Sequence, residues 1–127
     1  MNQEKQTGLK GDVPIVLSKW YDACKWILEK VDAFPKNQRF IFGTRLADRS
    51  LGILEKLVEA AYSQGEMKIE LLQTANRDLA MLRWLMRMAK DRQIITLKQY
   101  EYSCGLMFEC GRMLGGWIKD SQQRKRP

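Results

Sequence analysis

Three cations recur along one stretch of the chain, and their side chains could bind anions. Arg83, Arg87 and Lys90 are spaced by four and three residues, so a helix would hold them on one side. An arginine guanidinium offers a fork of N–H donors that matches phosphate or carboxylate, and a lysine ammonium acts as a point charge. These residues predict a surface for a polyanion or a protein partner.

The position of these cations on the predicted helix leaves two roles open. On a helical wheel with Leu79 at zero, Lys90, Arg83 and Arg87 fall at about 20°, 40° and 80°, at the edge of the apolar stripe. Long cationic side chains can lie along apolar surface with the charged head in water. In the alternative role, Arg83 pairs with a carboxylate at the edge of the core and stabilises the bundle.

An apolar patch occupies the other side of the same helix. Met81, Trp84 and Met88 fall at roughly 140° to 200° on that wheel, where a monomeric bundle would face water. Three large apolar side chains on one exposed face are better explained by contact with another subunit than as scattered surface residues. We therefore predict an oligomer interface there.

Catalytic and metal chemistry have little support in the sequence. The chain has no histidine, and neither a GxxxxGK nor a GxGxxG motif occurs. Glu55 and Glu59 lie four residues apart, which is more typical of a solvated helix face than of a metal site. Three cysteines without CxxC spacing predict neither a zinc site nor a disulfide framework, and we expect Cys24, Cys104 and Cys110 to be buried. We expect a binding protein rather than an enzyme, with no metal and no cofactor.

The elements that must position these residues are helices. Apolar residues recur at three- and four-residue spacing through most of the chain. The predicted helices run from Pro14 to Phe34-Pro35, from about Lys36 to Ser63, from about Glu66 to Lys90, and from Thr96 onward. We expect the third helix to bury Ile69, Leu72, Ala75, Leu79, Leu82, Met86 and Ala89. Four long helices with short connections predict an all-α, antiparallel up-down-up-down four-helix bundle.

Local signals set the ends of these helices. Gly65 is a predicted left-handed cap, and Thr96 with Gln99 three residues later fits a capping box. Gly111, Gly115 and Gly116 lie inside the fourth helix, where each glycine costs about 0.5 to 1 kcal/mol relative to alanine. Close approach of a second helix is the usual reason to keep such glycines.

The division of the chain and its charge follow from composition. We expect a flexible N-terminal arm over residues 1–11, the bundle over 12–120 and a basic, fraying tail over 121–127. Residues 83–127 hold ten Lys and Arg against four Asp and Glu, and so supply most of the net charge of +7. No secretory signal and no membrane-spanning run is visible, so we expect a soluble, cytoplasmic protein that does not bind membranes.

The segments LAMLRWLMRMA and GRMLGGWIK, with the helix layout, resemble the accessory variability determinant (Avd) proteins of diversity-generating retroelements. They also resemble the wider family of four-helix proteins encoded within intervening sequences of large-subunit ribosomal RNA. The resemblance covers nearly the whole chain and is strongest over 79–89 and 111–119. The segment around Asp91 to Ile95 and the N-terminal arm differ from the family pattern.

The resemblance implies a fold, an assembly and partners. Avd proteins are four-helix bundles that assemble as a ring-like homopentameric barrel with a basic surface. They bind the retroelement's reverse transcriptase and template-repeat RNA, with DNA as a further ligand, and support adenine-mutagenic cDNA synthesis and retrohoming. By resemblance, Arg83 and Arg87 match the basic positions of the third helix, Lys90 lies near its matching end, and Arg77 is a weaker candidate.

Two functions therefore remain open from the sequence. The first is a non-catalytic accessory subunit of a retroelement reverse transcriptase. The second is an RNA-associated four-helix protein of the intervening-sequence type, without a polymerase partner. Binding to the polymerase distinguishes the two.

Overall fold

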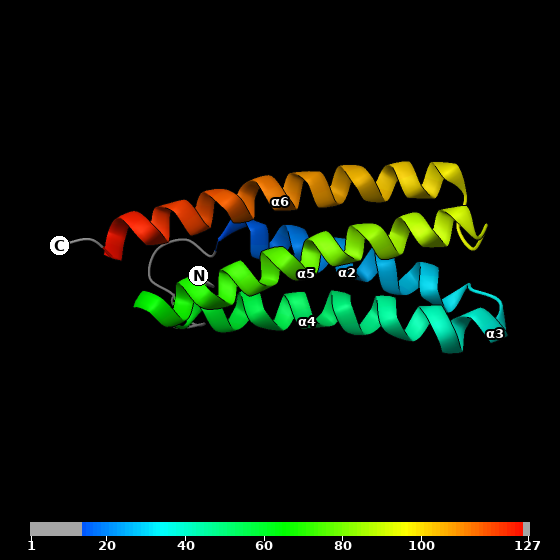
Figure 1. Ribbon diagram of the computed structural model, residues 1–127, viewed down its shortest axis with the longest axis horizontal. Helices are drawn as coiled ribbons and strands as arrows, with labels where there is room; N and C mark the ends of the chain where they lie inside the picture. The colour runs from blue at the N-terminus through cyan, green and yellow to red at the C-terminus, as the bar shows by residue number, and fades with distance from the viewer. Residues whose placement is uncertain (1–13, 126–127) are drawn as a thin grey trace, which may run out of the picture.

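The computed structural model describes residues 14–125, which form helices joined by short turns with no strand among them (Figure 1). In chain order the helices are α2 (Ile15–Asp32), α3 (Lys36–Gln38), η1 (Arg39–Gly43), α4 (Thr44–Ala61), α5 (Gly65–Asp91) and α6 (Leu97–Lys125). The predicted arm over residues 1–11 and the last two residues of the predicted tail lie outside the described residues.

The long helices alternate in direction, as an up-down-up-down bundle requires (Figure 1). Helix α5 packs against both α4 and α6, and α2 packs against α4 and α6 on the other side. This arrangement confirms the predicted all-α four-helix bundle. No helix of residues 14–125 has an apolar stretch long enough to cross a bilayer.

The apolar stripe of α5 forms the centre of the core. All seven side chains predicted to point inward from this helix are buried. On the opposite side of the core, Trp20 is fully buried and its indole N–H donates a hydrogen bond of 3.0 Å to the Ser50 carbonyl oxygen. This bond satisfies the one polar atom of the largest core side chain.

The second predicted helix is less regular than its sequence suggests. The chain is helical from Lys36 to Ala61, but η1 is a π-helical turn that separates α3 from α4. Gly43, at the end of that turn, lies so close to α2 that a Cβ there would be 2.9 Å from Val31 Cγ1. The π turn therefore seats this segment against α2, and a glycine is needed where the two meet.

The two predicted helix caps differ in outcome. Gly65 has the predicted left-handed backbone, with φ of 63°, but it does not cap α4, because the C-cap of α4 is Tyr62 and Gly65 is the first residue of α5. The capping box before α6 forms in both directions. The Gln99 N–H donates to Thr96 Oγ1 at 3.0 Å, and the Thr96 N–H donates to Gln99 Oε1 at 2.9 Å.

The predicted end of the fourth helix at residue 120 does not coincide with the end of α6. The helix continues to Lys125, and Ser121 is buried in the described structure. The part of the predicted tail from Ser121 to Lys125 is therefore helical in the described structure. The polar composition of SQQRK predicts a frayed end, whereas in the structure these residues continue the preceding helix.

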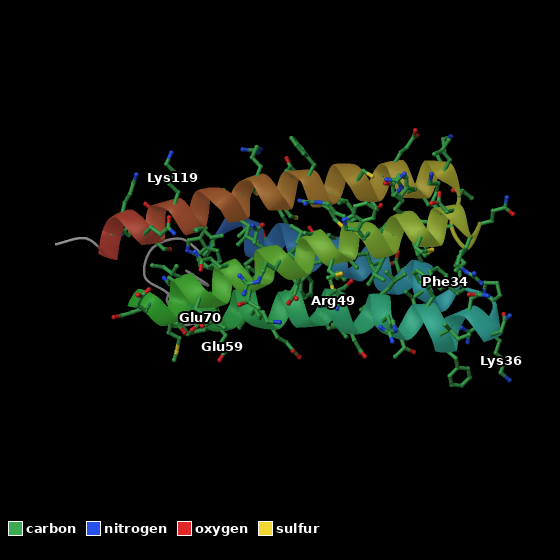
Figure 2. All side chains as sticks on the ribbon, in the orientation of Figure 1. Phe34, Lys36, Arg49, Glu59, Glu70 and Lys119 are labelled. Carbon is green, nitrogen blue, oxygen red and sulfur yellow. The ribbon has the colours of Figure 1, made fainter. Side chains whose placement is uncertain are left out.

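An ion-pair cluster fastens α4 to α5 at the edge of the core. The carboxylate of Asp78, whose side chain is 15% exposed, accepts from Arg49 at 3.0 Å and from Lys56 at 2.6 Å. Figure 2 shows Arg49 on the side of α4 that faces α5. One acid on α5 thus neutralises part of the charge of two cations on α4.

Replacing Asp78 with alanine should destabilise the protein by about 1 to 3 kcal/mol, because two cations lose a mostly buried partner. Urea denaturation of the variant measures this loss. Asp91→Ala is the matched control, since it removes an exposed ion pair with Lys90 that should contribute less than about 1 kcal/mol. Equal losses from the two variants would contradict a structural role for the Asp78 cluster.

Candidate functional site

The predicted cations Arg83, Arg87 and Lys90 lie along the side of α5 that faces α6. The Arg83 guanidinium lies against Gly111 of α6, where a Cβ would be only 2.6 Å from Arg83 Nη2. Lys90 Nζ lies 5.2 Å from the centre of the Tyr100 ring, at the start of α6. The structure thus brings these cations to the junction of two helices.

Two of these cations also contact residues of their own helix. The Arg87 guanidinium carbon is 5.6 Å from the centre of the Trp84 ring, a cation–π arrangement. Lys90 Nζ pairs with Asp91 Oδ1 at 3.0 Å. Lys90 is therefore partly neutralised, whereas the contact of Arg87 with Trp84 leaves its charge in place.

The alternative structural role of Arg83 is not what the geometry shows. Within residues 14–125, no ion pair joins Arg83 or Arg87 to a carboxylate. The acid at the edge of the core, Asp78, lies on the α4 side of α5 and pairs with the cations of α4. The charges of Arg83 and Arg87 therefore remain available at the surface.

Arg77 does not join this row. It lies six residues before Arg83, about 120° away around the helix, and its Nη2 donates to Thr74 Oγ1 of the same helix at 3.2 Å. Arg77 is exposed on the outer ridge of α5, in line with Trp84. A ligand in the α5–α6 junction would meet Arg77 only at its margin.

The predicted apolar patch is exposed, and it divides into two parts. Met81, Trp84 and Met88 all present large apolar surface. Met81 lines a groove between α4 and α5, whose other lining residues are Arg45, Asp48, Arg49, Gly52, Lys56, Asp78 and Leu85. Trp84 instead lies under the guanidinium of Arg87 and is closer to α6 than Met81 is.

Two residues of α6 at this junction are exposed against expectation from the sequence. Phe108 is 71% exposed, although an aromatic residue in an apolar stretch of helix is ordinarily expected in the core. Cys104 is exposed as well, so the prediction that it is buried was wrong. Helical spacing places Cys104, Phe108 and Gly111 on one side of α6, and Gly111 faces Arg83. In the sequence, only Gly111 indicated that this side of α6 lies close to another part of the bundle.

The glycines of α6 have different surroundings. Gly111 permits close approach, as predicted, although the group that approaches is the end of the Arg83 side chain. Within residues 14–125, Gly115 and Gly116 have nothing within 4 Å of where a Cβ would lie. Close packing among these residues therefore explains the first glycine and neither of the others.

The titration of Tyr100 reflects its place in this junction. A side-chain hydrogen bond with Cys104 raises the pKa of the Tyr100 phenol, and partial burial raises it further. The nearby charges of Arg87 and Lys90 oppose this rise. Tyr100 therefore stays a neutral donor or acceptor beside the cations at physiological pH.

The described residues offer no group that suggests a metal. In residues 14–125, no cluster of three or more Cys, Asp or Glu side chains is placed to hold an ion. The arrangement at the α5–α6 junction is suited to binding anions through charge and flat rings.

Comparison with known proteins places the chain in a family. A family model described as bAvd-like matches residues 14–121, a span that contains α2 to α5 and most of α6. No curated protein and no solved structure matches the chain.

The three thiols should differ sharply in reactivity. Burial raises the pKa of Cys24, and burial together with Glu109 raises that of Cys110 from 9.0 to about 11, so both remain protonated and shielded at neutral pH. A chromogenic disulfide reagent at about pH 8 should modify Cys104 rapidly, and Cys24 and Cys110 only in denaturant. A rapid phase that persists in a Cys104→Ser variant would contradict this assignment.

Gly111→Ala should move Arg83 without unfolding the bundle. The added Cβ would crowd only the end of the flexible Arg83 side chain, since Leu79 Cδ2 would lie at an ordinary contact distance of 3.5 Å. Alanine is also favoured over glycine in a helix by about 1 kcal/mol. Gly115→Ala, where the space is open, is the control and should be stabilising by that amount. Thermal unfolding should show no loss of stability in Gly111→Ala, and a large loss would mean that Arg83 cannot move away.

Proposed function

The chain belongs to the bAvd-like family, and from that membership we propose that it is a non-catalytic accessory subunit of a diversity-generating retroelement. In this role it binds the reverse transcriptase and the template RNA, together with the cDNA copied from it. It thereby supports adenine-mutagenic cDNA synthesis and retrohoming. The family match supports an accessory protein of the Avd type in general.

The observation that carries the binding part of the proposal is the charge of the α5–α6 junction. Arg83 and Arg87 have no carboxylate partner within residues 14–125, and Lys90 lies one turn further along. Such side chains can donate in pairs to phosphate oxygens or to the carboxylates of a protein partner. We place both contacts on this surface, with Arg77 at its margin.

Self-association is the second part of the proposal. Of the predicted interface residues Met81, Trp84 and Met88, we place self-association on Met81 and Met88, which are half exposed and lie further around α5 from α6 than Trp84 does. A closed ring, a pentamer by resemblance, would repeat the cationic junction on every subunit. Repetition converts several weak contacts with one long polyanion into strong overall binding.

Arg83→Ala combined with Arg87→Ala should weaken capture of the reverse transcriptase and of template RNA while leaving the helical circular dichroism spectrum unchanged. The measurement is a pull-down with the cognate polymerase in about 150 mM salt with nuclease added, because low salt exaggerates charge contacts. RNA binding is measured in parallel by filter retention. The matched control is the pair Lys25→Ala and Lys36→Ala, two exposed cations of α2 and α3 that lie outside the α5–α6 junction.

The outcomes of this experiment separate the candidate functions. Retention of the polymerase by the native protein, and its loss in the double variant, supports the accessory role. RNA binding without polymerase binding would instead favour an RNA-associated protein of the intervening-sequence type. Unfolding of the double variant would mean that the two arginines are structural.

A further inference from the structure

We propose that the α5–α6 junction binds unpaired nucleic acid, with Trp84 and Phe108 stacking on bases while Arg83 and Arg87 contact the phosphates between them. This inference rests on the proposed function and deepens it, because it names single strands as the ligand and adds two aromatic residues to the site.

The first observation is the exposure of the two rings. Trp84 is 66% exposed, whereas Trp20 is fully buried and Trp26 and Trp117 are half-buried. Phe108 is 71% exposed and belongs to a different helix. Exposed rings of this size are unfavourable in water, so a ligand that covers their faces would be stabilised by contact with them.

The second observation is the placement of the rings on either side of the cations. Trp84 carries the Arg87 guanidinium near one face of its ring. Phe108 lies one helical turn from Gly111, against which the Arg83 guanidinium rests. The two arginines thus lie between an aromatic residue of α5 and an aromatic residue of α6.

The third observation is the lack of acids in this area. Helix α5 has no acidic residue between Asp78 and Asp91, and these two are paired with Arg49 and Lys56 and with Lys90. Helix α6 has none between Glu101 and Glu109, and Glu109 pairs with Lys19 of α2. A polyanion would therefore meet little repulsion along the junction.

Cations with flanking rings fit unpaired bases better than other anions. In a duplex the faces of the bases are already stacked, so side chains reach mainly its backbone and its groove edges. A single strand offers both a flat π-face and a phosphate at every nucleotide, and aromatic residues in a cationic groove are the usual means of holding one. An acidic peptide would satisfy the arginines but leave the two ring faces without a flat partner.

The experiment compares binding of two polyanions in solution. One is a fluorescently labelled oligonucleotide of unpaired thymidines, about 12 nucleotides long. The other is inorganic polyphosphate, which has the negative charge but no bases, and binding to it is measured by displacement of the labelled strand. The proteins are the full chain, Trp84→Leu, Phe108→Leu and the double variant. Phe40→Leu is the matched control, because Phe40 is 76% exposed but lies in η1, away from the junction.

Leucine keeps apolar volume and removes the ring, so the variants test stacking rather than general hydrophobicity. We expect each leucine variant to bind the oligonucleotide about tenfold more weakly than the native protein does. The dissociation constant for polyphosphate, calculated from the displacement data with each variant's own affinity for the oligonucleotide, should be unchanged. Phe40→Leu should change neither affinity. The native protein should also prefer the unpaired strand to a duplex of the same length.

A second readout tests the Trp84 contact directly. Because Trp84 is the most exposed of the four tryptophans, a base stacked on it should quench the tryptophan fluorescence of the native protein. Trp84→Phe retains a ring, so it should keep most of the affinity while losing the quenching. A folded Trp84→Phe variant that binds as weakly as Trp84→Leu would overturn the stacking role of this residue.

The remaining outcomes have distinct meanings. If the leucine variants bind the oligonucleotide as well as the native protein does, stacking is overturned while the proposed function stands. If Trp84→Leu changes the subunit number in light scattering and loses both polyanions together, Trp84 belongs to the self-association surface and the inference is overturned. If the native protein binds neither polyanion, the nucleic-acid part of the proposed function fails as well.

Discussion

Helix α5 must pack against two neighbours at once, and this constraint shapes the rest of the molecule. Its inward stripe is filled by seven buried apolar side chains, so polar groups can lie only at the edges of the stripe or on the outer ridge. One edge faces α4 and the other faces α6. What each neighbour offers at its edge decides whether a charge on α5 is neutralised.

The two edges of the apolar stripe of α5 differ in whether their charges are paired. On the α4 side, α5 contributes an acid, Asp78, and α4 supplies two cations that pair with it. On the α6 side, α5 contributes the cations, and α6 supplies a glycine and a tyrosine rather than an acid. The first edge therefore holds the bundle together, and the second keeps uncompensated charge. A helical bundle can have a function of this kind, because binding requires only a surface with the right charge and shape.

The same arrangement links the stability of the protein to its proposed binding. Because Arg83 and Arg87 have no carboxylate partner within residues 14–125, their replacement removes binding groups without leaving a buried charge unpaired. Replacement of Asp78 has the opposite effect, because it leaves two cations of α4 without the carboxylate that pairs with both. The chain thus separates residues that maintain the fold from the residues proposed to contact a ligand, although both kinds lie at the edges of one helical stripe.

The sequence by itself determined the parts of the structure that depend on neighbours along the chain. Helical periodicity identified the buried stripe of α5 in full, and the spacing of Thr96 and Gln99 identified the cap of α6. It also placed Arg83, Arg87 and Lys90 on one side of the helix. These features follow from the 3.6-residue repeat and from local hydrogen bonds, which a sequence displays directly.

Only the tertiary structure decided what lies across from each of these residues. The sequence could not show that Arg83 meets Gly111, that Asp78 receives two cations from α4, or that Arg77 stands apart from the row. It misplaced Cys104 in the core and gave no role to Phe108, because both occur in an apolar stretch of α6 whose inward face is set by packing. The register and rotation of one helix against another arise from side chains far apart in the sequence, and periodicity within one helix does not specify them.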